Sequence, residues 1–266
     1  MLNRKKYLTG LFLGILIFSG AFLYIKNKEQ AKNLPVVDVK EIAQDDAATK
    51  PQIVDATGIV EVKIPDTVNL DVPFTSQAPT GNWKEEVFQD GCEEASALMA
   101  MGWVGKIKLG TPTSVEQQIR KITAFEKQRF GNVIDISSED TAKIIRQYFE
   151  YPNIEVRNQI TIQDIKKELA RGNLVLVPAF GQALKNPNYT APGPITHMLV
   201  IKGYDEAKQI FIANDSGTKR GKDYIYNQQI LFDAIWTYPT AMQHAAAPEK
   251  SKREKSMIVI SKNEIK

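Results

Sequence analysis

The sequence contains few residues that bind metals or form cross-links: one cysteine, Cys92, and two histidines, His197 and His244, among 266 residues. A single cysteine excludes a disulfide within the chain. The three side chains also lack the paired spacing of a zinc site, so we expect no metal. An excess of charge is missing too, because 34 basic and 31 acidic residues give a formal net charge of only +3. With no basic stripe interleaved with aromatic residues, the sequence predicts no nucleic-acid partner.

Charge is absent from one segment near the start of the chain. Residues 7–25 are 19 consecutive uncharged residues, which at about 1.5 Å per residue just span a hydrocarbon core of about 30 Å. The basic residues at positions 4–6 precede this segment, so the positive-inside rule keeps residues 1–6 in the cytoplasm and sends the rest across. The alternative is a signal peptide that is cleaved near Ser19 and Ala21, which would give a secreted protein. We expect a retained, single-pass anchor in the cell membrane.

Composition and periodicity divide the exported part into three regions. Residues 26–65 are predicted to be a stalk and an entry strand, residues 66–240 a folded domain, and residues 241–266 a polar basic tail. Helical periodicity and capping residues predict four helices in the first half of the domain: Cys92 to about Val104, Thr113 to about Arg129, Ser137 to about Tyr151, and Thr161 to Gly172. Apolar runs in the second half predict strands at 174–178, 197–204, 209–213 and 224–226, before a helix at 227–238.

Cys92 follows a glycine turn at Asp90-Gly91 and begins a strongly helical stretch. The positive end of a helix favours the thiolate, which is the form that attacks carbonyl groups. Thiols outside the cytoplasm tend to pair, yet Cys92 has no partner within the chain. A small buried side chain is the plain alternative, and a nucleophile is the functional one.

A thiol nucleophile needs a base, and the two histidines differ in their suitability. His197 starts an apolar strand after a proline-rich loop at 181–196, whereas His244 lies in the polar tail. We therefore take His197 as the candidate base. Asn214 and Asp215 end the next strand, and either could orient the second ring nitrogen of His197.

The oxyanion that forms during acyl transfer also needs hydrogen-bond donors. Gln77 lies in an ordered loop between two prolines, before the cysteine. Its side-chain amide and the backbone N–H of Cys92 are the candidate donors.

Four blocks of sequence carry a family resemblance. They are Pro73-Phe74-Thr75-Ser76-Gln77, Asp90-Gly91-Cys92-Glu93-Glu94-Ala95-Ser96, Thr196-His197-Met198-Leu199-Val200-Ile201-Lys202-Gly203-Tyr204 and Ala213-Asn214-Asp215-Ser216-Gly217. In this order they resemble the bacteriocin-processing (double-glycine leader) branch of papain-like cysteine peptidases, in its stand-alone form without a transporter domain. The resemblance spans about Leu70 to Tyr238. It implies an α+β, papain-like fold in which the helix that bears the nucleophile packs on an antiparallel sheet that bears the base.

The resemblance also implies a role for each site residue. Cys92 corresponds to the nucleophile, His197 to the general acid and base, Asp215 to the orienting residue and Gln77 to the oxyanion donor. Two positions depart from the family pattern: Glu93 follows the cysteine where glycine is frequent, and Ser216 stands in place of proline. A carboxylate beside the sulfur opposes thiolate formation.

The sequence therefore predicts an extracytoplasmic cysteine peptidase or amidase, anchored to the membrane by its N-terminal helix and acting without a cofactor. Its partner would be a peptide or protein substrate, or cell-wall material; the extracytoplasmic location argues against assuming a double-glycine leader. Two alternatives stay open. One is an inactive papain-like module that binds peptide or cell-wall material in a cleft beside residues 181–196. The other is an acyl transferase of the transglutaminase-like type.

Overall fold

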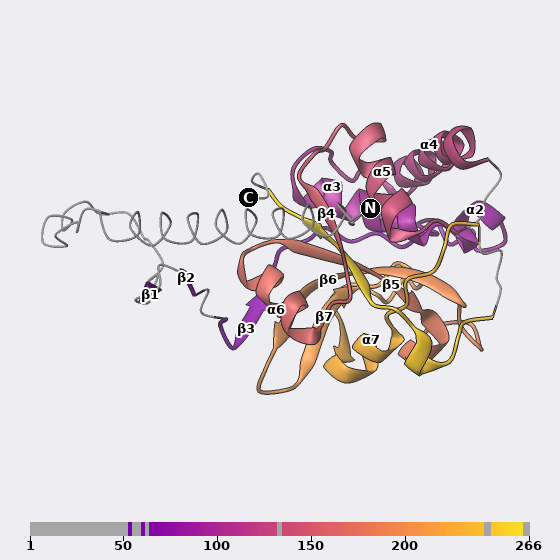
Figure 1. Ribbon diagram of the computed structural model, residues 1–266. Coiled ribbons are helices and arrows are strands. Elements are labelled where there is room, and N and C mark those ends of the chain that lie inside the picture. Colours follow the sequence, from indigo (N-terminus) through magenta and orange to yellow (C-terminus); the bar gives the residue numbers. More distant parts are fainter. Residues whose placement is uncertain (1–52, 55–59, 62–63, 132–134, 242–245, 263–266) are drawn as a thin grey trace, which may run out of the picture. The chain divides into compact units, whose positions relative to one another are not determined.

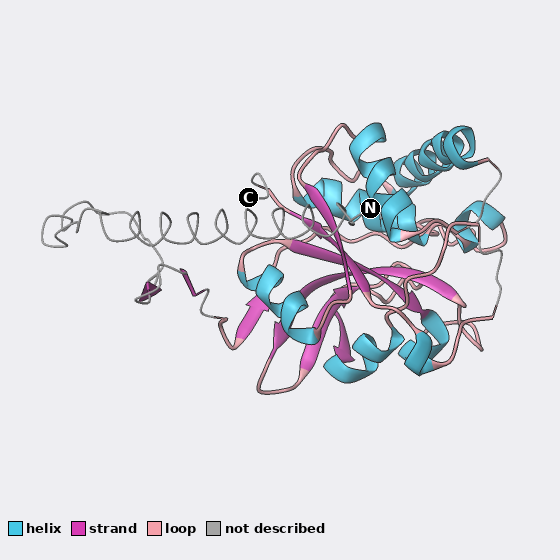
Figure 2. Cartoon of the chain, viewed as in Figure 1, coloured by secondary structure: helices cyan, strands magenta, loops and turns pink. Residues whose placement is uncertain are grey.

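A seven-stranded antiparallel sheet forms the centre of the domain (Figures 1 and 2). The computed structural model describes residues 53–54, 60–61, 64–131, 135–241 and 246–262. The strands of the sheet are β3 (Thr67–Asn69), β4 (Ile154–Asn158), β5 (Leu174–Phe180), β6 (Thr196–Asp205), β7 (Ile210–Asn214), β8 (Tyr224–Asn227) and β9 (Ser256–Ile260). Their order is β4-β9-β5-β6-β7-β8, and β3 pairs with the end of β6. A separate pair is formed by β1 (Ile53–Val54) and β2 (Val60–Glu61).

Helices cover both faces of the sheet. One face carries α3 (Cys92–Trp103), α4 (Pro112–Phe130) and α5 (Ser138–Tyr148), with the short α2 (Glu86–Gln89) before them; the other carries α6 (Ile162–Ala170) and α7 (Gln228–Ala234) (Figure 2). Because successive side chains of a strand point to opposite faces, Leu174 and Leu176 join the core under α3, while Val175 and Val177 join the core under α6. This two-sided burial explains why β5 and β6 are continuous apolar runs. The α+β fold class is confirmed.

The predicted helix starts agree with the structure at two of three capping positions. Thr161 forms a capping box with Asp164, and the Ser137 side chain accepts a hydrogen bond from the Asp140 N–H. The helix predicted to start at Thr113 begins earlier, because Thr111 is the N-cap of α4 and Pro112 occupies its first turn. Thr113 is therefore inside the helix.

Two helices end sooner than their periodicity suggests. The helix that starts after Ser137 ends at Tyr148 and not Tyr151. The last helix, α7, ends at Ala234 and not Tyr238, because Ile235 takes an extended conformation and pairs with Ala179 of β5. The hairpin of β6 and β7 across residues 205–208 is as predicted.

The prediction of a polar basic tail over residues 241–266 is wrong for its second half. Ser256–Ile260 is β9, a fully buried strand between β4 and β5 in the sheet. The apolar run is only five residues long and has charged residues before and after it, so the sequence pattern does not predict a strand. Its partner β4 was not predicted either. The folded domain consequently extends to about residue 260 and not to 240.

No helix among the described residues is long and apolar enough to cross a membrane. The anchor predicted at residues 7–25, the stalk up to residue 51 and His244 lie outside the described residues.

Candidate active site

Cys92 is the first residue of α3, as the sequence predicts. Gly91 precedes it at a close approach, because a Cβ at this position would lie 2.8 Å from the Val87 carbonyl oxygen. Farther along the helix, the Ser96 hydroxyl donates to the Met198 carbonyl oxygen at 3.3 Å. This bond joins α3 to β6 at the residue next to His197, so the helix that begins with Cys92 is held directly against the strand of the candidate base.

His197 on β6 and Asp215, directly after β7, form a buried hydrogen-bonded pair. His197 Nε2 lies 2.8 Å from Asp215 Oδ1. Asp215 reaches the ring because it directly follows β7, which pairs with β6. The other candidate, Asn214, instead donates to the carbonyl oxygens of Val72 and Pro73. Of the two residues left open by the sequence, the structure places Asp215 on the imidazole.

Asp215 accepts hydrogen bonds from three further side chains and one backbone group, which are Asn186 Nδ2 (3.0 Å), the Tyr189 hydroxyl (2.6 Å), the Tyr226 hydroxyl and Gly217 N–H (3.0 Å). Burial would raise the pKa of Asp215, but the charge of His197 and these hydrogen bonds outweigh it and lower the pKa to about 2. The aspartate therefore stays ionised and fixes the His197 ring.

Sequence reasoning missed these supporting residues. Asn186 and Tyr189 come from the loop at 181–196, whose length alone suggested a function, and Tyr226 lies on β8. Gly217 was also missed: a Cβ there would lie 2.9 Å from His197 Cε1 and 3.0 Å from Tyr189 Cε1. A glycine is thus required for the ring of His197 to occupy its position.

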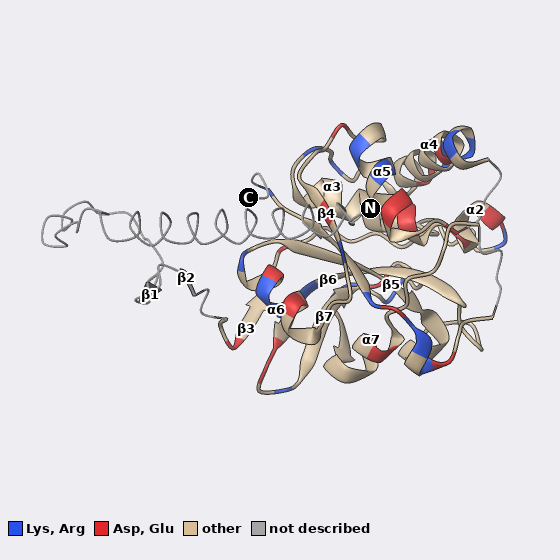
Figure 3. Cartoon of the chain, in the orientation of Figure 1, with Lys and Arg blue, Asp and Glu red and all other residues tan. Residues whose placement is uncertain are grey.

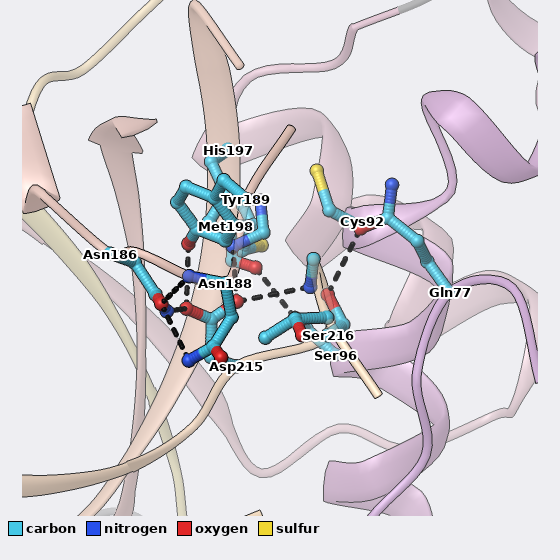
Figure 4. Close-up of polar contacts among 12 residues, drawn as sticks. Gln77, Cys92, Ser96, Asn186, Asn188, Tyr189, His197, Met198, Asp215 and Ser216 are labelled. Atoms are coloured by element: carbon cyan, nitrogen blue, oxygen red, sulfur yellow. Dashed lines mark hydrogen bonds and ion pairs between the residues drawn. The ribbon is translucent and has the colours of Figure 1, made fainter. Parts of the chain in front are cut away.

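Cys92, His197 and Gln77 line one cleft of about 440 Å³. Figure 4 shows Cys92 and Gln77 on the helix side of this site and His197 with Tyr189 on the strand side. The structure therefore brings together all four candidate residues, three on the cleft wall and Asp215 directly behind His197. No group of three or more His, Cys, Asp and Glu side chains within the described ranges has the arrangement of a metal site.

Gln77 is positioned by three hydrogen bonds. Its Nε2 donates to the carbonyl oxygens of Phe88 (3.2 Å) and Gln89 (2.6 Å), and its Oε1 accepts from the Ser216 hydroxyl (3.4 Å). Both amide hydrogens thus have acceptors in this state, so Gln77 must release one of them to donate to an oxyanion. The Cys92 backbone N–H, at the first position of a helix, has no acceptor within the helix.

The thiol of Cys92 donates to Glu93 Oε2 at 2.9 Å, and Glu93 Oε1 accepts from the Tyr238 hydroxyl at 2.8 Å. Burial raises the pKa of the Cys92 thiol well above its ordinary value, and the Glu93 carboxylate adds to the increase. The helix N-terminus alone predicts the opposite direction. Burial also raises the pKa of Glu93, to about 8, with contributions from Asp135 and Glu94.

A thiol at the start of a helix, opposite a histidine that an aspartate orients from an antiparallel sheet, is the arrangement of papain-like cysteine peptidases. The model of the Peptidase_C39 like family matches residues 69–242. The chain belongs to this family of cysteine peptidases, which confirms the resemblance to the bacteriocin-processing branch.

A crystal structure described as that of a C39-like peptidase from Bacillus anthracis is similar to this chain, with a TM-score of 0.48 and 15% sequence identity. The match covers 75% of this chain and 99% of that chain. No curated protein matches the sequence.

Proposed function

We propose that the protein hydrolyses peptide or amide bonds with Cys92 as nucleophile, His197 as general acid and base, and Asp215 as the residue that orients His197. The observation that carries this proposal is the 2.8 Å His197–Asp215 pair in the wall of the cleft that also contains Cys92. Asp215 accepts the Nε2 proton of the neutral imidazole, which leaves Nδ1 with a free lone pair for the thiol proton.

In this mechanism the thiol turns from Glu93 to His197 when substrate binds. His197 takes the proton, and the sulfur forms a bond to the amide carbonyl carbon. The backbone N–H of Cys92, joined by Gln77 after it releases a backbone carbonyl, donates to the oxyanion. The C–N bond then breaks as His197 protonates the leaving amine. A water molecule attacks the thioester, gives its proton to His197, and the carboxylic acid leaves while the sulfur recovers a proton.

The proposal is tested by alkylation of Cys92 with iodoacetamide between pH 5 and 9. Because Cys92 is the only cysteine, the reaction reports on this thiol alone. We expect the rate constant of the wild type at pH 7 to exceed that of His197→Ala by about 10-fold or more, since a paired base contributes at least this factor. His244→Ala is the matched control, because it removes the other histidine, and it should react like the wild type.

An equal rate for wild type and His197→Ala at every pH would contradict the proposal and favour an inactive binding module. If peptide hydrolysis is found, the same assay with an added primary amine separates the two chemistries: new amide products would indicate acyl transfer, and free acid indicates hydrolysis.

We also propose that the domain acts outside the cytoplasm on peptide, protein or cell-wall substrates and is held there by residues 7–25. Support comes from the uncharged length of this segment and the basic residues before it. Alkaline carbonate extraction of membranes tests the anchor, and a membrane-impermeant protease added to intact cells tests the side. Release by carbonate would contradict a retained anchor, and full protection in intact cells would contradict the location.

A further inference from the structure

Asp135, at the wall of the cleft, has a carboxylate oxygen with no hydrogen-bond partner among the described residues. The residue is buried, with 2% of its surface exposed, and it lines the cleft with Cys92 and His197. Its Oδ1 accepts from the Thr196 hydroxyl at 2.5 Å, whereas Oδ2 has no hydrogen-bond partner within the described part of the chain. A buried, unpaired carboxylate oxygen is costly, and native proteins satisfy nearly all such atoms. A donor from outside the described residues, such as a group on a bound substrate, would satisfy this oxygen.

The acidic side chains of the cleft wall are not balanced by lysine or arginine from the residues that the structure describes. Asp90 and Asp135 line it, and none of the described residues that line it is lysine or arginine. Glu93 lies directly behind the thiol. Elsewhere the two signs are spread over the helices (Figure 3), and the chain as a whole has a formal charge of +3. The excess of acidic groups is thus a local property of the cleft.

We propose that Asp135 is a specificity residue that binds a cationic group, an ammonium or a guanidinium, on the substrate next to the bond that is cleaved. This inference rests on the proposed function, because it assigns a substrate class to the same cleft. Thr196 supports the placement: it holds Oδ1 of Asp135 and is the neighbour of His197 on β6.

A cation fits this site better than a neutral donor. Hydrogen bonds between a charged donor and a carboxylate are roughly twice as strong as neutral ones. A cation also offsets the charge of Asp135, which a neutral amide would leave uncompensated in a buried position. A substrate with an anionic group at this position would instead meet Asp90, Asp135 and, when ionised, Glu93.

The test compares two reagents of similar size that form a mixed disulfide with Cys92: 2-aminoethyl methanethiosulfonate, which is cationic, and 2-sulfonatoethyl methanethiosulfonate, which is anionic. Each rate constant is divided by that of the same reagent with a small free thiol. The quotient of the two values cancels the thiolate fraction of Cys92 and leaves the charge preference of the cleft. The full-length protein serves for all measurements.

We expect the wild type to favour the cation by about 10-fold or more at low ionic strength, within the range of electrostatic focusing in clefts, and added salt to reduce this preference. Asp135→Asn, which keeps the acceptor for Thr196, should lower the preference by about 3-fold or more. Asp66→Asn is the matched control, because Asp66 is exposed and does not line the cleft, and it should leave the preference unchanged.

The proposal is overturned if the wild type shows no preference, or if Asp135→Asn retains the full preference. The wild-type measurement keeps the test decisive even where Asp135→Asn does not fold. Failure of the proposed function has a different signature, namely a Cys92 alkylation rate that does not depend on His197. If neither methanethiosulfonate modifies Cys92, the cleft does not admit substrate to the thiol, and both proposals fail.

Discussion

Asp215 on the strand side of the cleft and Glu93 on the helix side are both buried carboxylates, yet their pKa values move in opposite directions. Asp215 accepts from five donors, among them the ring of His197, and its pKa falls to about 2. Among the described residues, Glu93 accepts from two donors, the Cys92 thiol and the Tyr238 hydroxyl, and it lies near Asp135 and Glu94. Burial and these neighbouring carboxylates raise its pKa to about 8.

The comparison shows that burial does not by itself decide the charge of a carboxylate; the supply of donors and the sign of the neighbours do. Asp215 on the strand side consequently stays ionised at every physiological pH. The helix side takes up or releases protons between about pH 7 and 8, where Glu94 and Glu93 titrate. The orientation of the His197 ring should thus be insensitive to pH, whereas the reactivity of the Cys92 thiol should change with pH.

Removing the charge of Asp215 should have the largest effect. In Asp215→Asn the NH₂ group is a donor, whereas three side-chain donors converge on this carboxylate in the wild type. The amide cannot accept from all of them and from His197 Nε2, so the imidazole loses its fixed tautomer. We expect peptide hydrolysis to fall by about 10³- to 10⁴-fold and the free energy of unfolding to fall by about 1–3 kcal/mol. A peptide-hydrolysis assay and urea unfolding measure the two effects, and Asp66→Asn is the control of equal charge change.

The pH dependence of stability provides a second measurement on the same variant. The folded pKa of Asp215, about 2, lies below its ordinary value of 3.8. Its stabilisation is therefore complete above about pH 4 and is lost as the pH falls toward 2. Asp215→Asn should lack this acid-sensitive contribution. An unchanged acid dependence of stability would contradict the role of the hydrogen-bond donors around Asp215.

Glu126 on α4 should have the next largest effect, with the opposite sign. It is buried beside Glu94, and its Oε1 has no partner within the described residues. Burial and the charge of Glu94 raise its pKa well above the ordinary value. Because a folded carboxyl with a raised pKa binds more protons than an unfolded one, ionisation of Glu126 costs stability as the pH rises above the ordinary value of 4.5.

Glu126→Gln should remove part of this loss and stabilise the protein by about 1–2 kcal/mol at pH 8, with no gain at pH 4.5. Urea unfolding at the two pH values measures the difference. Glu139→Gln, which changes an exposed glutamate on α5, should not alter the pH dependence. A destabilisation by Glu126→Gln at pH 8 would show that the carboxylate is paired there.

Glu93→Gln should sharpen the comparison at the thiol itself. The substitution keeps an acceptor for Tyr238 and removes the carboxylate that raises the pKa of Cys92. Above pH 8, where Glu93 is ionised, we expect alkylation of Cys92 to become about 3- to 5-fold faster, the effect of a partly screened charge. Below pH 6 the two rates should agree. Glu139→Gln is the control. If the pH profile of Glu93→Gln superimposes on the profiles of the wild type and of this control, this role of Glu93 is refuted.

The strand side of the site was more predictable from sequence than the helix side, for a physical reason. His197 lies at the start of one strand of a hairpin and Asp215 directly after the end of the other, so local pattern and chain order place them together. The donors to Asp215 come from other parts of the chain, because Asn186 and Tyr189 lie in the loop at 181–196 and Tyr226 on β8. Such convergence depends on the packing of the complete sheet, which single-sequence patterns do not contain.

The helix side shows the corresponding limit for electrostatics. Cys92 at the start of a helix was recognised from Gly91 and the helical stretch that follows, and the sequence set the helix end, which favours the thiolate, against Glu93, which opposes it. The structure adds burial, the largest effect, and Asp135 to that of Glu93, and together they raise the pKa of the thiol. In the same way, β9 is an inner strand of the sheet because it pairs with β4 and β5. Its five residues alone do not contain this information.

Tyr238→Phe should have the smallest effect and the most specific one. The Tyr238 hydroxyl donates to Glu93 Oε1 and lowers the pKa of Glu93 relative to burial alone. Without this bond, whose net worth is about 0.5–1.5 kcal/mol, Glu93 should ionise about half a pH unit to one unit later. The pH above which the alkylation rate of Cys92 falls below the rate in Glu93→Gln should increase by the same amount. Tyr148→Phe on α5 is the matched control. In the Glu93→Gln background Tyr238→Phe should change nothing, because the two residues act through one proton; an additive effect would mean that Tyr238 influences the thiol by another route.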